Sequence, residues 1–225
     1  MSDTHVLHRG VRGIRQALTS PSKPGTIAPV VRHLRTKFAE RDMKPLFTVH
    51  AGEYLVGSYI EQTHPRWCVW VPSKDTGIDL LVTDSANRRT VSLQVKFSKD
   101  FTPMHRPIFL QNKLMSAGWW THQQEKIQNS AADFWVFVLP SFIEHKTSFI
   151  IIPPGDLLRR LRAIHGRTGK RIHSYLWVTK TKRCWEARGL SNADQELIAF
   201  DRFSDKPRDF SDFLNAWQQI EGRLK

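Results

Sequence analysis

Cysteines and long apolar runs are scarce in this chain of 225 residues. The only two cysteines, Cys68 and Cys184, lie far apart, which argues against a disulfide framework and against a zinc cluster built on cysteine. No apolar run approaches the roughly 18 residues of a membrane helix. The N-terminal stretch also lacks the continuous apolar segment of a secretory signal. We therefore expect a cytoplasmic protein that does not enter a membrane.

Several familiar catalytic motifs are missing as well. The sequence has no GxSxG motif to present a serine nucleophile and no GxxxxGK[ST] loop to hold nucleotide phosphates. Its ten histidines form no HxH or HExxH group, so a histidine metal site is not indicated. Carboxylates, amides and lysines therefore remain as the candidate residue types for a functional site.

Acidic residues are few relative to basic ones. Thirty-four Lys and Arg face twenty-one Asp and Glu, which gives a formal net charge of +13. Such an excess favours a polyanionic partner, with nucleic acid first; ribosome-like binding, an anionic membrane surface or plain solubility would give the same charge. The 40% hydrophobic content, with thirteen Phe and eight Trp, predicts a packed globular domain.

The first 44 residues are a predicted basic helical arm, followed by one domain over residues 45–225. A helix over residues 27–41 would carry Arg32, Arg35 and Lys37, which are candidates for contacts with DNA phosphates. The alternative is a helix that only packs on the main domain.

Helical and strand patterns alternate along the main domain. They predict an α/β fold with a mixed central sheet and helices on both faces. The expected helices cover residues 51–62, 121–132, 154–164 and 210–220, and the expected strands cover residues 67–71, 78–84, 91–97, 134–139, 148–152, 175–179 and 184–187.

The strands over residues 78–84 and 91–97 carry the most informative pattern. Alternation along a strand places Gln94 and Lys96 on one face. A four-residue turn over residues 85–88 pairs Asp84 with Arg89, and the same register sets Asp79 opposite Gln94, with Cβ atoms about 5 Å apart. A carboxylate, an amide oxygen and an ammonium together suit Mg²⁺ and an attacking water, as phosphodiester hydrolysis requires.

Glu53 is a second candidate acid, because it borders the apolar stripe of the helix over residues 51–62. Each of these residues also has a structural interpretation. Asp79 could begin a strand after a Thr76-Gly77 turn, Lys96 could be a solvated strand lysine, and Glu53 could stabilise a helix N-terminus. A register error of one residue would bring forward other candidates, namely Glu61, Asp84 and Lys99.

Glu53, Asp79 and Gln94-Val95-Lys96 resemble, in order and spacing, the motif of the PD-(D/E)xK or restriction-endonuclease-like nucleases. The resemblance covers roughly residues 45–139 and implies an α-β-β-β-α-β core. It assigns Asp79, Gln94 and the Val95 carbonyl to the metal and Lys96 to the attacking water. Glu53 is either an acid that supports these ligands or a ligand of a second metal ion. Gln94 stands where most members have an acid, as it does in Mrr-like restriction nucleases and the transposon-end-cleaving subunit of heteromeric transposases.

The resemblance implies a Mg²⁺-dependent DNA endonuclease, with Mn²⁺ as an alternative ion. Double-stranded DNA is the expected substrate, and a homodimer or a partner protein is left open. The basic residues Lys180, Lys182 and Arg183 are further candidates for phosphate contact, against an ordinary solvated surface. The rival functions are a nucleic-acid-binding module that keeps the nuclease fold without turnover, and an enzyme that acts on RNA.

Overall fold

The computed structural model describes residues 51–74, 76–166 and 171–225. The basic arm predicted for residues 1–44, with Arg32, Arg35 and Lys37, lies outside these residues. In chain order the elements are α1 (Ala51–Thr63), β1 (Trp67–Trp70), β2 (Leu80–Asp84), β3 (Thr90–Phe97), α2 (Ile108–Gln111), β4 (Leu114–Gln123), α3 (Gln124–Gln128), β5 (Phe134–Ser141), β6 (Lys146–Ile152), α4 (Pro154–His165), β7 (Arg171–Thr179), β8 (Cys184–Glu186), α5 (Asn192–Ala199), the 3₁₀ helix η1 (Ser211–Phe213) and α6 (Gln218–Leu224).

Five strands form a mixed sheet in the order β1-β2-β3-β5-β6. The first three strands are antiparallel neighbours, β3 and β5 run parallel, and β6 returns antiparallel to β5. Strand β5 is buried from Phe134 to Leu139, as expected of a central strand covered on both faces. The predicted α/β class with a mixed central sheet is therefore confirmed.

Strands β4, β7 and β8 form a second, antiparallel sheet. The predicted hairpin is confirmed by the β7–β8 pairs from Leu176↔Glu186 to Val178↔Cys184. The helix predicted over residues 121–132 was wrong, because β4 runs to Gln123 and α3 is only five residues long. Pairing with β7 along the whole of β4 outweighs the local helix preference of this polar stretch.

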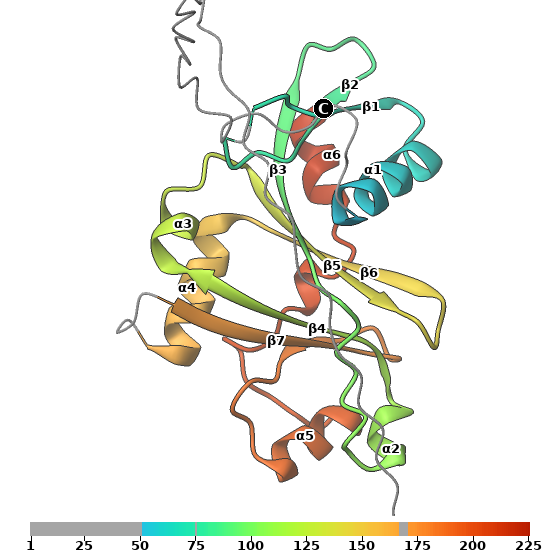
Figure 1. The fold of residues 1–225 in the computed structure, drawn as a ribbon, viewed down its shortest axis with the longest axis vertical. Helices are drawn as coiled ribbons and strands as arrows, with labels where there is room; N and C mark the ends of the chain where they lie inside the picture. The colour runs from blue at the N-terminus through green and yellow to red at the C-terminus, as the bar shows by residue number, and fades with distance from the viewer. Residues whose placement is uncertain (1–50, 75, 167–170) are drawn as a thin grey trace, which may run out of the picture. The chain divides into compact units, whose positions relative to one another are not determined.

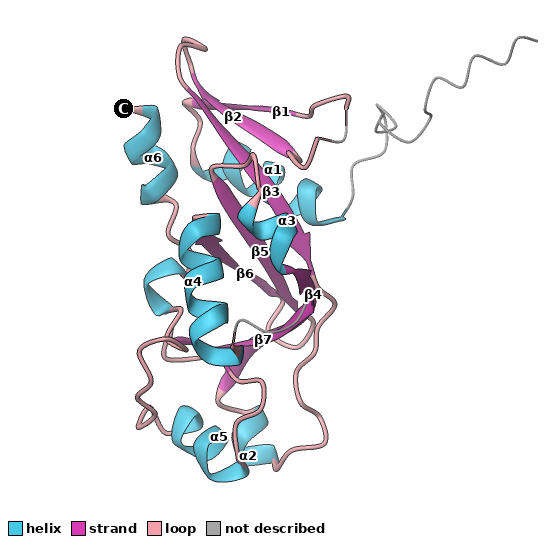
Figure 2. Ribbon diagram, turned by 90° about the vertical axis from the view of Figure 1, so that its left-hand side faces the viewer, coloured by secondary structure: helices cyan, strands magenta, loops and turns pink. Residues whose placement is uncertain are grey.

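The two faces of the five-stranded sheet pack against different partners (Figures 1 and 2). Helices α1 and α6 cover one face, where a core forms from Val56, Ile60, Leu80, Val82, Val91, Leu93, Val95, Phe134, Val136, Val138, Phe149, Ile151, Trp217, Ile220 and Leu224. The other face packs against α4 and the second sheet, with a core that includes Trp120, Trp135, Phe137, Ile150, Leu157, Leu161, Ile172 and Leu176. The second sheet therefore takes the place of a helix layer on part of this face.

The helix predicted over residues 210–220 was also wrong, since η1 and α6 are separate. Between them Asn215 has a φ of +50° and pairs with β6. Its backbone N–H donates to the Phe149 carbonyl at 2.6 Å, and its Oδ1 accepts the Phe149 N–H at 2.9 Å. These two hydrogen bonds compete with helix continuation and end it.

The short helices α2 and α5 were not predicted. Ser191 and Asp194 form a capping box that begins α5. Figure 1 shows α2 and α5 next to each other, and the Phe109 and Phe200 rings stack between them with centroids 5.9 Å apart. None of the helices in the described residues combines the length and apolar character needed to cross a bilayer.

Candidate active site

The β2–β3 hairpin has the predicted register. Its ladder runs from Thr83↔Thr90 to Leu80↔Leu93, and the Asp84 N–H donates to the Arg89 carbonyl at 3.3 Å across the turn. Glu61, Asp84 and Lys99 were alternative site residues only if the predicted register was wrong by one residue. The observed register removes that reason. The same alternation turns Val95 toward the α1 side and leaves Gln94 and Lys96 on the opposite face.

Asp79 lies one residue beyond the last ladder pair and is 8% exposed. Its backbone N–H donates to the Leu93 carbonyl at 2.8 Å. Its carboxylate Oδ2 accepts the Val95 N–H at 2.6 Å. Gly77, with a φ of +81°, provides the left-handed turn that leads into this position. Both the backbone and the side chain of Asp79 are thus fixed to β3.

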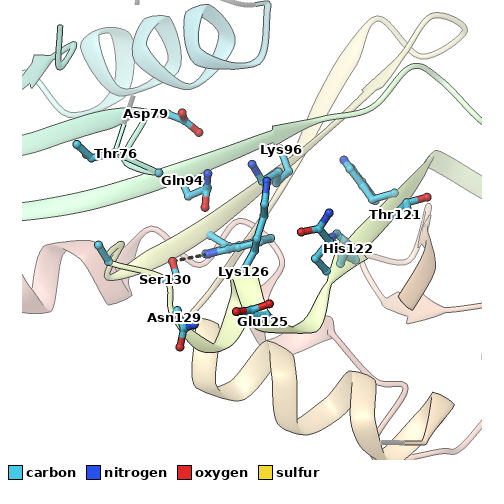
Figure 3. Close-up of a pocket in the computed structure, with 15 residues that line it drawn as sticks. Thr76, Asp79, Gln94, Lys96, Thr121, His122, Glu125, Lys126, Asn129 and Ser130 are labelled. Atoms are coloured by element: carbon cyan, nitrogen blue, oxygen red, sulfur yellow. Dashed lines mark hydrogen bonds between the residues drawn. The ribbon is translucent and has the colours of Figure 1, made fainter. Parts of the chain in front are cut away.

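A cavity of about 910 Å³ opens beside this hairpin end (Figure 3). Asp79, Gln94 and Lys96 line one wall. The structure therefore brings together three of the four predicted catalytic side chains. The remaining lining residues are Thr76, Gly77, Trp120, Thr121, His122, Gln123, Glu125, Lys126, Asn129, Ser130, Ala131 and Trp135.

The Lys96 ammonium lies 5.2 Å from the centroid of the Trp135 ring. This cation–π contact helps to hold the charged end of Lys96 within the cavity. The Trp135 indole is itself held in place, because its Nε1–H donates to Ser130 Oγ at 2.9 Å. Lys96 is therefore placed by β5 as well as by its own strand.

His122 on β4 forms part of the opposite wall and is 4% exposed. Its Nε2 lies 2.8 Å from Ser174 Oγ. Burial, and then the positive charges of Lys96 and His173, lower the pKa of His122 to about 3. The imidazole is therefore neutral near pH 7, so His122 adds no positive charge to the wall that faces Lys96.

Two hydrogen bonds join the β4 wall to the end of β3. The Trp120 indole Nε1–H donates to the Phe97 carbonyl at 3.1 Å. The Trp119 backbone N–H donates to Ser98 Oγ at 3.0 Å. These contacts connect the two sheets beside the cavity.

Glu53, the fourth predicted catalytic residue, lies in the first turn of α1 and is 5% exposed. The N-terminal turn of α1 packs closely on β3, because a Cβ atom added to Gly52 would lie only 2.8 Å from Phe97 Cβ. Glu53 does not belong to the set of side chains that lines the cavity. The structure thus buries this acid near β3 without adding it to the wall formed by Asp79, Gln94 and Lys96.

The three described DNA-binding candidates lie elsewhere, at the β7–β8 turn. Thr179, which precedes them, pairs with Leu114. Leu114 is seven residues along β4 from the cavity residue Thr121, and at the usual rise of a strand this separation is roughly 20 Å. Lys180 is paired with Glu144 at 2.7 Å and Arg183 with Asp209 at 2.7 Å, while Lys182 is exposed. Two of these cations already have carboxylate partners.

The wall formed by β4 and α3 was not predicted from the sequence. Because residues 121–132 were predicted as one helix, His122 and Lys126 were not considered together with the hairpin. The sequence nonetheless alternates here, since the ring-bearing residues Trp120 and His122, which are buried, alternate with the polar residues Thr121 and Gln123, which are exposed. This alternation is typical of a strand.

Oxygen atoms dominate the candidate ligands for a metal ion. Within residues 51–74, 76–166 and 171–225, no three or more His, Cys, Asp and Glu side chains gather as a metal-binding group. The donors at the hairpin are instead one carboxylate, one amide oxygen and a backbone carbonyl, of the hard type that Mg²⁺ and Mn²⁺ prefer. Comparison with family models, with curated proteins and with solved structures finds no match to this chain.

Proposed function

We propose that this chain is a metal-dependent DNA endonuclease with a restriction-endonuclease-like core. The element order supports this core: α1 precedes the antiparallel strands β1, β2 and β3, and β5 lies parallel to β3. Helix α3 precedes β5, as in the α-β-β-β-α-β unit that the sequence resembles. Strand β4 is an addition between β3 and α3, and it belongs to the second sheet.

The observation that carries the proposal is the shared placement of Asp79, Gln94 and Lys96. All three line one cavity, and the hairpin ladder together with the Asp79–Val95 hydrogen bond fixes their spacing. An acid, an amide and an ammonium in one cavity suit the hydrolysis of a phosphodiester.

A divalent metal ion fits the chemistry of these donors. Asp79, Gln94 and the Val95 carbonyl would hold Mg²⁺ or Mn²⁺. Such an ion supplies a Lewis acid that makes water more acidic and neutralises charge on the phosphate. Because Gln94 is neutral, the set carries one negative charge fewer than a pair of acids would.

The protein side chains around the donors each have a task. Lys96 provides a fixed positive charge for the phosphate oxygens and for the attacking water. The Trp135 ring lies against the Lys96 ammonium, and the neutral His122 adds no competing positive charge on the facing wall. Glu53, buried at the start of α1, is the acid expected to support the site from the β3 side.

The charge balance favours DNA as the substrate. A net charge of +13 attracts a phosphate backbone regardless of its sequence. Double-stranded DNA is the proposed form, and RNA is the alternative that a direct comparison of substrates separates.

A non-catalytic nucleic-acid-binding module is the second candidate. Gln94 favours it, because a neutral amide replaces the acid that most nucleases of the resembled family carry at this position. Such a module would bind nucleic acid through its charge and would hydrolyse nothing.

Incubation of the purified chain with supercoiled plasmid separates the two candidates. The nuclease predicts nicked or linear product with Mg²⁺ or Mn²⁺ and none with a chelator. A parallel reaction with an RNA of matched length tests the alternative substrate. Tight duplex binding without cleavage in any divalent metal would favour the binding module.

A further inference from the structure

Helix α3 contributes a second cation to the candidate active-site cavity. Lys126 is exposed, lines the cavity, and extends from α3 toward β3, where Lys96 lies (Figure 3). None of the ion pairs within the described residues involves Lys126. Two lysines therefore share one cavity, although like charges repel each other.

The alternative explanation is that Lys126 only stabilises the end of its helix. Basic residues in a last turn do interact favourably with the helix dipole. However, α3 has only five residues, and the Lys126 side chain points into the cavity instead of folding back over the α3 carbonyls (Figure 3). Glu125 also lines this wall, but its carboxylate points away from Lys96 in the same view.

Hydrogen-bond donors accompany Lys126 on this wall. Asn129 is exposed, and its side-chain amide can donate two hydrogen bonds. Ser130 Oγ accepts hydrogen bonds from Trp135 Nε1–H at 2.9 Å and from the Ala132 N–H at 3.3 Å. Its hydroxyl hydrogen is thus available to a ligand in the cavity.

Helix α3 is held in position by α4. Arg162 donates through Nε to Gln124 Oε1 at 2.9 Å and through Nη2 to Gln128 Oε1 at 3.0 Å. Ile127, between them, is buried in the core below. The helix that carries Lys126 is therefore fixed at both ends, which preorganises its donors for a ligand.

The cavity is larger than a metal site requires. Its volume of about 910 Å³ is near the upper end of ordinary ligand pockets. A metal ion with its water molecules fills only a small part of this space, since one water takes about 30 Å³. The wall formed by α3 has room for a further group of the same ligand.

We propose that Lys126, Asn129 and Ser130 form a second phosphate-binding subsite, which takes a backbone phosphate next to the one held by Asp79, Gln94 and Lys96. The ligand class is an oligonucleotide with at least two phosphates, and this identification rests on the proposed function. In this arrangement Lys96 acts on the scissile phosphate, whereas Lys126 binds its neighbour and positions the strand.

Three variants test the subsite: Lys126→Ala, Lys126→Arg, and Lys113→Ala as an exposed lysine outside the cavity. Duplex affinity is measured without divalent metal over a range of salt, and kcat and KM are measured with Mg²⁺. Lys126→Ala should weaken binding and raise KM by about tenfold, lower the log-log salt slope by about one, and change kcat less than about threefold. Lys126→Arg should restore binding, and Lys113→Ala should match the parent.

A readout that needs no turnover separates this subsite from the proposed function. The dinucleotide pTpT is added to the ¹⁵N-labelled chain without metal, and the amide signals of Lys126, Asn129 and Ser130 are followed. Shifts that Lys126→Ala abolishes would support the subsite even if the parent cuts no DNA. The subsite is overturned if Lys126→Ala leaves affinity and salt slope at the parental values, or if pTpT leaves the three amides unmoved.

Discussion

The backbone N–H of Val95 donates to the carboxylate of Asp79 at 2.6 Å, across the open end of the β2–β3 hairpin. Asp79 is therefore oriented by the main chain of its neighbouring strand. Because this hydrogen bond does not depend on any side chain of β3, substitutions at Gln94 or Lys96 should leave the carboxylate in place. Variants at the three positions can thus be interpreted separately.

Asp79→Asn should lower the rate of plasmid cleavage by at least about a hundredfold, since metal and fixed charge provide most of the stabilisation in phosphoryl transfer. The amide oxygen of Asn can still accept the Val95 N–H, so the fold should be retained. Asp84→Asn, at the other end of β2, is the matched control and should cleave normally. Parental activity in Asp79→Asn would show that the site is assigned wrongly.

Lys96→Ala should also lower cleavage by at least about a hundredfold, through the loss of positive charge at the phosphate. A second effect can be measured without turnover. Because Lys96 is one of the charges that lower the pKa of His122, this variant should raise that pKa, as followed by NMR titration of the imidazole. An unchanged His122 pKa would place the Lys96 ammonium away from the β4 wall. Lys99→Ala, just beyond β3, is the control for both readouts.

Gln94→Glu should bind Mg²⁺ more tightly, because a second carboxylate replaces a neutral amide. The parent should accordingly need a high Mg²⁺ concentration, and Mn²⁺ should serve it better. Calorimetric titration of both proteins with each ion checks this. Equal affinities in parent and variant would argue against Gln94 as a ligand.

His122 makes stability depend on pH. Its folded-state pKa of about 3 lies below the usual 6.5. Above pH 6.5 both states are neutral and the residue has no effect. As the pH falls below 6.5, the unfolded chain gains a proton that the folded chain excludes, so stability should fall by about 1.4 kcal/mol per pH unit until the pH nears the folded-state value.

Urea unfolding at pH 7, 6 and 5 measures this dependence. In His122→Gln the part of the pH dependence due to this residue should disappear, whereas His105→Gln, at an exposed position outside the sheets, should keep it. Parallel pH profiles in the parent and His122→Gln would contradict the burial of a neutral imidazole.

Arg208→Ala should destabilise the chain by about 3–5 kcal/mol, because it leaves the fully buried Glu186 carboxylate without its guanidinium partner. Arg208 Nη1 donates to Glu186 Oε2 at 2.7 Å and also to the Glu186 and Arg188 carbonyls. Arg159→Ala removes an exposed ion pair with Asp156 and should have little effect. Thermal unfolding of both variants tests the difference, and similar melting temperatures would contradict it.

The hairpin that carries the candidate site was predictable because its rules are local. Alternation assigns Gln94 and Lys96 to one face, and a four-residue turn then fixes which residues pair. Both signals lie within residues 78–97. The strands β5 and β6 were also predictable, because they form long apolar runs between turn-forming residues.

Strand β4 was not predictable in this way. Its pairing partner β7 lies about fifty residues further along the chain, as in the pair Thr121↔His173, and no local pattern encodes that distance. The polar residues around Gln123 and Lys126 also suit a helix. Missing β4 meant that the wall with His122 and Lys126 was missed as well, although the wall with Asp79 was predicted.

The two walls of the cavity between β3 and α3 are held in place by different kinds of contact. A hydrogen-bonded ladder fixes the β2–β3 wall, while helix α3 of the other wall is held by side-chain contacts such as Arg162 to Gln124. Changes at the exposed positions Glu125, Lys126 and Asn129 can therefore alter the charge of one wall without disturbing the strands of the other or the Ser130–Trp135 contact beside Lys96. A library confined to these three positions would offer a route to new ligand preferences on an unaltered reaction centre.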